Sequence, residues 1–377
     1  MDPADAVDSL RDSLRTRFLY LLLASNLTKR GVEPRLRKEQ DELANFIEGS
    51  LPHELRSKGP HVAKLLDHAI AAHGKYLPRK RPFEIIASDF QALMKQQDVW
   101  RFGIEFGWLE DRYDLSGLPL PRDLPPHARI GLAHHAGLAS VEELFLLEDT
   151  YLLLTRAEEL HARMLRAAED AKIEQASTDG EMERMLRRMN AEVGTLCRLT
   201  VVNSVAFVEA FVNSIGWAAA LRHPTLSDQA RTELKGTQRG RYLSLERKLE
   251  RYPFLIRCDG SRPIVVSDKG QIREPFLSFL AETQEVRDAS MHYAPGKLRI
   301  LRPPGDWVSR ARSAAEHGIA VAREFWSACY PARGYPDYLD DLEHARFLRR
   351  ASAYVQEDSR SRALQRPSAA PGAPGAA

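Results

Sequence analysis

An arginine and a histidine stand out in the stretch EVRDASMHYAP, residues 285–295, because their side chains suit acid–base chemistry on a phosphate. Arg287 and His292 are five positions apart, which is about 140° of rotation on a regular α-helix, so they do not share a face. Asp288 and His292 are four apart and do share one. Arginine grips phosphate oxygens with two donors, and histidine moves protons near neutral pH. The pair therefore predicts a phosphate site at a helix end.

The proline at position 295 disfavours helical geometry at the residue before it, Ala294, so we expect His292 in the last helical turn. The helix dipole and the nearby Asp288 carboxylate there both favour the charged imidazolium. Spacing alone leaves a structural reading open, in which the arginine forms an ion pair and the histidine only caps the helix.

A carboxylate lies inside the most apolar helix that the sequence predicts, VVNSVAFVEAFVNSIGWAAAL (201–221). Such a helix is buried in a bundle, and its polar residues Asn203, Glu209 and Asn213 argue against a membrane span. A buried carboxylate is costly unless a cation pairs with it. Arg287 is the best-placed partner for Glu209, and another arginine or a solvent-facing groove is the alternative.

Helical periodicity dominates the 377 residues, so we expect an all-α fold. RPIVVS (262–267) is the best candidate for a strand, and we expect either a short strand or an extended loop there. The segment LSGLPLPRDLPPHARIG (115–131) holds four prolines and two glycines without apolar periodicity and marks a domain junction. We therefore expect an N-terminal helical region over 1–130, of unassigned role, followed by a helical bundle over 131–335.

The last part of the chain, 336–377, is expected to be an extension that is disordered from about residue 360, because RPSAAPGAPGAA is low-complexity. Before it, a final amphipathic helix is predicted over about 307–330. Its expected buried face consists of Trp307, Ala311, Ala314, Gly318, Ala322, Phe325 and Cys329.

Composition narrows the class of protein. The net charge of +2 supplies no bulk attraction to nucleic acid, so any basic site must be local. Cys197, Cys258 and Cys329 are far apart, without a Cys-x-x-Cys or Cys/His pairing. They argue against a disulfide framework or a zinc site and suit a reducing cytosol. The acidic N-terminus is a poor secretory signal, so we expect a cytoplasmic protein.

Three stretches together resemble the HEPN (higher eukaryotes and prokaryotes nucleotide-binding) domains, which are helical bundles. RDASMH (287–292) matches their motif of an arginine, four to six residues and a histidine. AFVEAFVNSIGW (206–217) resembles the buried second helix of many members, and SLERKLERYPFLI (244–256) resembles the segment that often precedes the motif helix. The resemblance covers roughly 140–332.

The resemblance implies a homodimer in which two Arg–His pairs converge in a composite cleft. Many HEPN domains are metal-independent ribonucleases of toxin–antitoxin, abortive-infection or CRISPR-linked defence systems. His292 would then assist proton transfer as a ribose 2′-hydroxyl attacks the adjacent phosphate, and Arg287 would stabilise the developing charge. The products would be a 2′,3′-cyclic phosphate and a 5′-hydroxyl, with no metal or cofactor.

Supporting roles are expected for four further side chains: Asp288, Glu209, Asn213 and Tyr293. Asp288 follows the motif arginine and would orient one of the pair, although an asparagine is commoner there. Glu209 would hold Arg287 from the apolar helix. The tyrosine directly follows His292, whereas toxins modified by a partner nucleotidyltransferase carry theirs two residues after the histidine.

Basic residues near the motif are expected to form an RNA-binding rim: Arg239, Arg241, Arg247, Lys248, Arg251 and Lys297. The expected partners are an RNA substrate, a second copy of the chain, and an antitoxin or defence-system component, with no membrane. The alternative function is a non-catalytic HEPN-like scaffold for dimerisation or for RNA or nucleotide binding.

Overall fold

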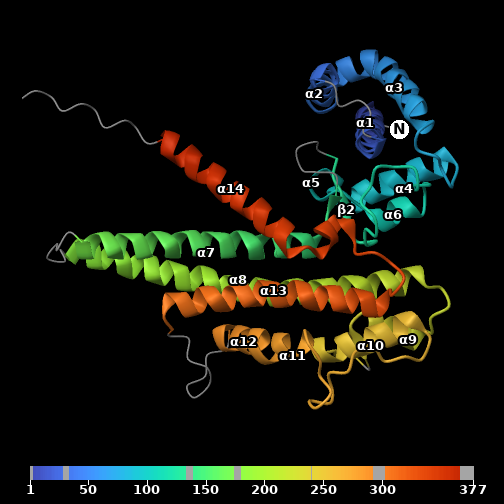
Figure 1. Ribbon diagram of the computed structural model, residues 1–377. Coiled ribbons are helices and arrows are strands. Elements are labelled where there is room, and N and C mark those ends of the chain that lie inside the picture. The colour runs from blue at the N-terminus through green and yellow to red at the C-terminus, as the bar shows by residue number, and fades with distance from the viewer. Residues whose placement is uncertain are drawn as a thin grey trace, which may run out of the picture. The chain divides into compact units, whose positions relative to one another are not determined.

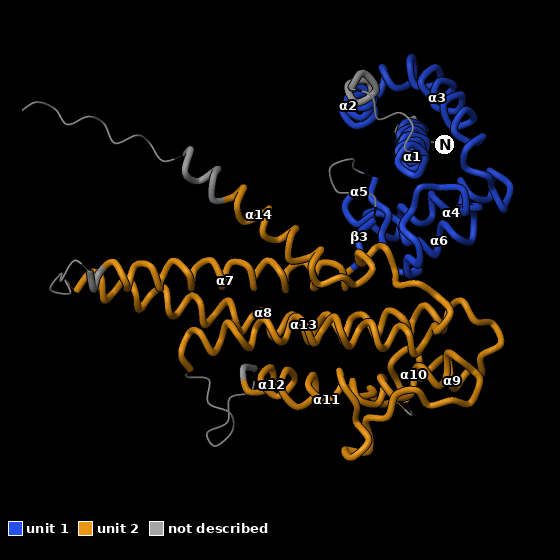
Figure 2. The backbone as a smooth tube through the Cα atoms, in the orientation of Figure 1, with its two compact units in different colours: residues 1–141 blue, residues 142–377 orange. Residues whose placement is uncertain are grey.

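The computed structural model describes residues 3–28, 34–132, 139–173, 180–238, 240–291 and 302–365. The chain divides into two compact units, residues 1–141 and 142–377 (Figure 2). Both consist mainly of helices, so the expected all-α fold is confirmed. The division follows residue 141 rather than 130, and the proline-rich segment 115–131 belongs to the first unit, where Gly107 N donates to Pro126 O over 2.7 Å.

Six helices of the first unit lie within the described residues: α1 (Pro3–Thr28), α2 (Pro34–Gly49), α3 (Pro52–Gly74), α4 (Phe83–Gln96), α5 (Val99–Phe102) and α6 (Phe106–Glu110). Helix α1 packs against α2, α3 and α4, and its residues Leu14, Leu23 and Leu27 are fully buried. Two buried tyrosines join it to the loop after α6, where the hydroxyls of Tyr20 and Tyr113 are 2.8 Å apart.

A small antiparallel sheet completes the first unit: β1 (Ile104–Glu105), β2 (Arg129–Ile130) and β3 (Ala139–Ser140). Ile104 pairs with Ile130, and Arg129 pairs with Ser140. Gly103 precedes β1 at φ 69°, and a Cβ atom there would lie 2.5 Å from the Ile130 carbonyl oxygen. Only glycine fits that approach.

The second unit contains the predicted bundle (Figure 1). Its described helices are α7 (Glu142–Ile173), α8 (Gly180–Arg222), α9 (Asp228–Leu234), α10 (Leu245–Arg257), α11 (Phe276–Ser278), α12 (Glu285–Met291), α13 (Pro304–Cys329) and α14 (His344–Gln365). A short hairpin joins α9 to α10, with β4 (Thr237–Gln238) paired to β5 (Arg241–Tyr242). A π-helical turn, η2 (Phe279–Gln284), lies between α11 and α12, and a 3₁₀ segment, η3 (Asp337–Leu342), precedes α14.

Helix α8 is the centre of this unit, and α7 and α13 run along it (Figure 1). The predicted buried face of α13 is confirmed at all seven positions. A Cβ atom at Gly318 of α13 would lie 2.5 Å from Ser204 Oγ of α8, so this glycine allows the two helices to approach closely. Ser204 Oγ in turn donates to the Ala314 carbonyl over 2.6 Å. The close packing of α8 and α13 therefore lets the buried hydroxyl of Ser204 find an acceptor.

Within the described residues, α8 is also the one helix with a window long and apolar enough to cross a membrane. Half of that window is buried against its own unit. A core helix passes the same test of length and composition, so this is weak evidence for a membrane span.

Residues 262–267 run as irregular chain before α11, so the loop is present there rather than the strand. Helix α14 continues to Gln365, past residue 360, where disorder was expected to begin. The described part of α14 packs against α7 through buried Phe347, Ala351 and Val355, which explains why the helix forms so near the low-complexity tail.

Candidate functional site

The segment that carries Arg287 is built from three short pieces. Helix α11 leads into η2, and η2 leads into α12. The buried side chains of Phe279, Thr283, Val286 and Ala289 hold this segment against the bundle. A π turn holds one more residue than an α turn and is frequent at functional sites. It sets the rotational position at which α12 presents Arg287.

Two carboxylates hold the guanidinium of Arg287. Its Nη2 donates to Glu209 Oε1 of α8 over 3.0 Å, and its Nη1 lies 3.0 Å from Asp288 Oδ1 on its own helix. The arginine side chain is 24% exposed, whereas those of Glu209 and Asp288 are 45% and 51% exposed. The ion pair that the sequence indicated between Glu209 and Arg287 is therefore present.

Glu209 is not buried, however, and this part of the expectation is wrong. Asn213 and Trp217 follow it at four-residue intervals, and both are exposed. The three residues form a stripe on which α8 faces solvent. The large apolar Trp217 interrupts the polar pattern and makes the helix read as apolar all round.

A second pair of contacts joins α10 to the same place. Lys248 Nζ donates to Asn213 Oδ1 over 2.8 Å, and Gln284 Nε2 donates to Glu246 Oε1 over 2.9 Å. Burial lowers the pKa of the Lys248 ammonium, while the nearby carboxylate of Glu209 opposes that shift. The motif cluster thus consists of Glu209, Asn213, Glu246, Lys248, Gln284, Arg287 and Asp288.

Glu246 stays ionised within this cluster. Partial burial alone raises the pKa of its carboxyl, but hydrogen bonds from its own backbone amide, Gln284 and Ser244 outweigh that effect. The charge of Arg287 lowers the pKa further, and the net shift is downward. A hydrogen-bonded carboxylate beside a cation is favoured in its charged form.

The charges of the motif cluster do not sum to a positive site. Arg287 and Lys248 supply two positive charges, and the carboxylates of Glu209, Asp288 and Glu246 supply three negative ones. A phosphate that reached Arg287 would compete with carboxylates already bound to it. The cluster therefore holds Arg287 in a fixed position and does not form an open anion site.

The expected RNA-binding rim divides into three groups. Arg241 on β5 and Arg247 on α10 are exposed. Lys248 is held by Asn213, and Arg251 is bound to the buried carboxylate of Glu233 with Nη2 at 2.9 Å from Oε2. Arg239 and Lys297 lie outside the described residues.

His292 and Tyr293 also lie outside the described residues, and α12 ends at Met291, directly before them. The structure thus brings together Glu209, Asn213, Lys248, Arg287 and Asp288 of the predicted site. Sequence reasoning missed Glu246 and Gln284. Gln284 precedes Arg287 by three positions, so helical spacing was an available signal for it. No spacing indicates Glu246, which lies on a different helix from Arg287.

Among the described residues, no group of three or more histidine, cysteine, aspartate or glutamate side chains is arranged to hold a metal ion. Comparison with protein-family models, curated proteins and solved structures finds no match to this chain.

Proposed function

We propose that this protein is a metal-independent endoribonuclease, with Arg287 and His292 as its catalytic residues. The observation that supports the proposal best is the ion pair between Arg287 and Glu209, which fixes the motif arginine from a second helix. Catalytic groups need such support, because a transition state is stabilised by charges that are already oriented.

The proposed reaction is a phosphoryl transfer within the RNA strand. The ribose 2′-oxygen forms a bond to the adjacent phosphorus while the bond from phosphorus to the 5′-oxygen breaks. His292 assists transfer of the 2′-hydroxyl proton, and the leaving 5′-oxygen gains a proton. Arg287 stabilises the negative charge on the phosphorane-like transition state. The products are a 2′,3′-cyclic phosphate and a 5′-hydroxyl.

The surrounding side chains position these groups. Glu209 sets the direction of the Arg287 guanidinium, and Asp288 holds its other terminal nitrogen. Asp288 is also four residues before His292, at the spacing of helical neighbours. Lys248 and Asn213 fix the α8–α10 side of the motif cluster.

We propose further that two copies of the chain form a homodimer whose Arg–His pairs face one cleft. The exposed Arg241 and Arg247 would contact RNA phosphates at its rim. The family resemblance implies a toxin or anti-phage effector with an antitoxin or defence partner, and the sparse cysteines suit a cytoplasmic enzyme. The first unit would then recognise a trigger or a regulator.

A specific observation favours a second candidate, a non-catalytic scaffold for dimerisation or RNA binding. Two carboxylates already occupy the terminal nitrogens of Arg287, and the motif cluster carries an excess of negative charge. A structural arginine would have the same contacts. The two candidates therefore differ in whether phosphate displaces Asp288 from Arg287.

The test is cleavage of total RNA and tRNA by purified protein in excess chelator. We compare the wild type with His292→Ala, Arg287→Ala and the control Arg312→Ala, which breaks an ion pair between Arg312 of α13 and Glu158 of α7. The proposal expects cutting by the wild type and the control alone, with cyclic-phosphate ends.

Light scattering measures the oligomeric state of the same samples. Cleavage that persists in both motif variants would contradict the assigned residues. A folded, dimeric wild type that leaves all RNA intact would favour the scaffold.

A further inference from the structure

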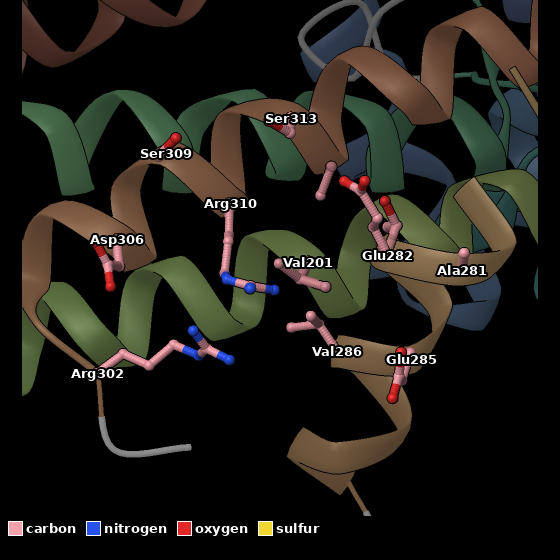
Figure 3. Close-up of a pocket in the computed structure, with 12 residues that line it drawn as sticks. Val201, Ala281, Glu282, Glu285, Val286, Arg302, Asp306, Ser309, Arg310 and Ser313 are labelled. Atoms are coloured by element: carbon pink, nitrogen blue, oxygen red, sulfur yellow. The ribbon is translucent and has the colours of Figure 1, made fainter. Parts of the chain in front are cut away.

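A cavity of about 510 Å³ lies between α13, η2, α12 and α8, next to the motif cluster. Two arginines enter it from the α13 side. Arg310 projects from the helix itself, and Arg302 comes from the chain just before it (Figure 3). Their guanidinium groups point toward one another in the cavity (Figure 3). Two positive charges therefore share one small space.

Neither guanidinium forms an ion pair or a hydrogen bond within the part of the chain that the structure describes. The Nε–H of Arg302 is buried and has no acceptor among the described residues. Both side chains are only partly exposed, and water solvates them incompletely. Buried cationic donors are costly when they are unpaired, and like charges that face each other repel. An anion between them would satisfy both requirements.

The rest of the lining divides the cavity into two ends. Ser309 and Ser313 add hydroxyl donors one turn apart on α13. Val201 of α8 and Val286 of α12 form an apolar wall that faces the arginines (Figure 3). This wall suits the uncharged remainder of a ligand whose anionic group lies at the arginine end.

Three carboxylates also line the cavity and restrict the ligand. Glu282 and Glu285 come from η2 and α12, away from the two guanidinium groups (Figure 3). Asp306 is exposed on the first turn of α13, and it pairs with neither arginine. The three carboxylates disfavour negative charge on the part of a ligand that lies away from the two arginines. A small anion at the arginine end avoids that repulsion, and so does a larger ligand with one anionic end and a neutral or hydroxyl-bearing remainder.

We propose that this cavity binds a phosphate group, carried by a larger molecule, through Arg302 and Arg310. A guanidinium donates two parallel hydrogen bonds to a phosphate, so two of them can engage most of its oxygens. A cavity of this size falls in the range that holds a small organic ligand and exceeds what inorganic phosphate alone would fill.

The phosphate can come from a free phosphorylated small molecule or from the backbone of a bound RNA strand. The shared chemistry is an oxyanion held between two guanidinium groups. The observations that support the site involve neither His292 nor Arg287. The inference therefore does not rest on the proposed function, and it stands if the protein proves to be a scaffold.

The first experiment is calorimetric titration of the full chain with inorganic phosphate and with pyrophosphate at constant ionic strength. Arg302→Gln and Arg310→Gln remove one guanidinium each, and Arg312→Gln is the matched control on the same helix. We expect each cavity variant to weaken pyrophosphate binding by at least about tenfold, as expected for a charged hydrogen-bond partner. Arg310→Lys keeps the charge but lacks the planar guanidinium, so its affinity for pyrophosphate should lie between those of the wild type and Arg310→Gln.

A gain-of-affinity variant separates binding from damage to the fold. Glu282→Gln removes a negative charge from the cavity, so it should tighten pyrophosphate binding. A merely structural role for the two arginines predicts no such gain. Circular dichroism of every variant confirms that the helices are intact.

The second arm uses a fluorescent hexanucleotide of 2′-O-methyl RNA, which lacks the hydroxyl needed for cleavage. Loss of its binding in Arg310→Gln, together with displacement by pyrophosphate, identifies RNA as the source of the phosphate. Loss of pyrophosphate binding alone identifies a free small molecule. The proposal is overturned if the wild type binds neither probe, or if both Gln variants bind the probes as tightly as Arg312→Gln does.

Discussion

Arg287 and the two cavity arginines belong to neighbouring parts of one bundle, yet their charges are balanced in opposite ways. Both terminal nitrogens of Arg287 contact carboxylates, one from α8 and one from α12. Arg302 and Arg310 contact none among the described residues, although three carboxylates line the same cavity. The guanidinium of Arg287 is thus paired with carboxylates of its own cluster, whereas those of Arg302 and Arg310 have no such partner among the described residues.

The difference shows what each place can do without rearrangement. An arginine held by two carboxylates has a fixed direction, and binding to phosphate requires it to exchange a partner. Two arginines that have no partner among the described residues gain one without losing another. Binding affinity for anions is therefore expected in the cavity, and transition-state stabilisation is expected from the oriented arginine.

The largest expected effect is that of Arg287→Gln, which should act on the motif cluster and not on the cavity. Arg287→Gln should lower the kcat for RNA cleavage by at least about 100-fold, because the charge that stabilises the transition state is lost. Pyrophosphate binding to the cavity should change by less than roughly twofold, since Arg287 does not line it. Single-turnover cleavage and calorimetry on the same preparations give both values.

The reciprocal variant is Arg302→Gln combined with Arg310→Gln. It should lose pyrophosphate binding, and any loss of cleavage should appear in KM rather than in kcat. If the double variant lowers kcat as much as Arg287→Gln does, the two places act as one site and the distinction drawn above is wrong.

A smaller effect comes from relaxing the hold on Arg287. Asp288→Asn removes one negative charge beside it. Two unit charges 4 Å apart in water interact by about 1 kcal/mol, so binding of the non-cleavable RNA should tighten by roughly fivefold.

Glu209→Gln is the matched comparison, because it removes the other carboxylate and the anchor to α8 as well. It should lower kcat while leaving the free energy of unfolding within about 1 kcal/mol of the wild type, as for other exposed pairs. Urea denaturation measures the stability of both variants. Weaker RNA binding by Asp288→Asn would mean that Asp288 positions the arginine rather than competing for it.

The smallest effect concerns Lys248. Burial lowers its pKa, so its amine should titrate below the ordinary lysine value of about 10.4. The carboxylate of Glu209 opposes that shift, so Glu209→Gln should lower the pKa of Lys248 further. NMR titration of ¹³C-methylated lysines measures both.

The control is Glu250→Gln, which removes a carboxylate of α10 whose Oε2 accepts from the backbone of residues 266 and 267. An equal shift of the Lys248 pKa in both variants would show that the interaction with Glu209 is not specific.

The sequence was informative where a physical requirement allowed few solutions. A carboxylate among apolar residues needs a cation, and this requirement led from Glu209 to Arg287. The buried face of α13 followed from three- and four-residue spacing. The solvent-facing stripe of α8 could not be predicted in the same way. Trp217 is exposed, but its residue type is one that the sequence leads us to expect in the core.

The π turn and the arginine pair of the cavity could not be predicted, because they depend on contacts between distant segments. FLAETQ, the sequence of η2, contains no glycine or proline and reads as ordinary helix, so nothing in it signals a π turn. Arg302 and Arg310 are eight positions apart, and no spacing rule indicates that a guanidinium lacks a partner. Such an absence is visible only once every neighbouring side chain is in place.

The π turn of η2 also makes this part of the molecule sensitive to the number of residues rather than to their identity. Each residue of an α-helix adds about 100° of rotation, so deleting one residue from η2 would rotate α12 relative to α8 by that angle. Arg287 would then leave the direction of Glu209, although every side chain of the motif would still be encoded. An insertion or deletion in this one turn therefore changes the rotation of α12 about its axis. Such a variant keeps the motif in its sequence but loses the arrangement of the motif side chains in the structure.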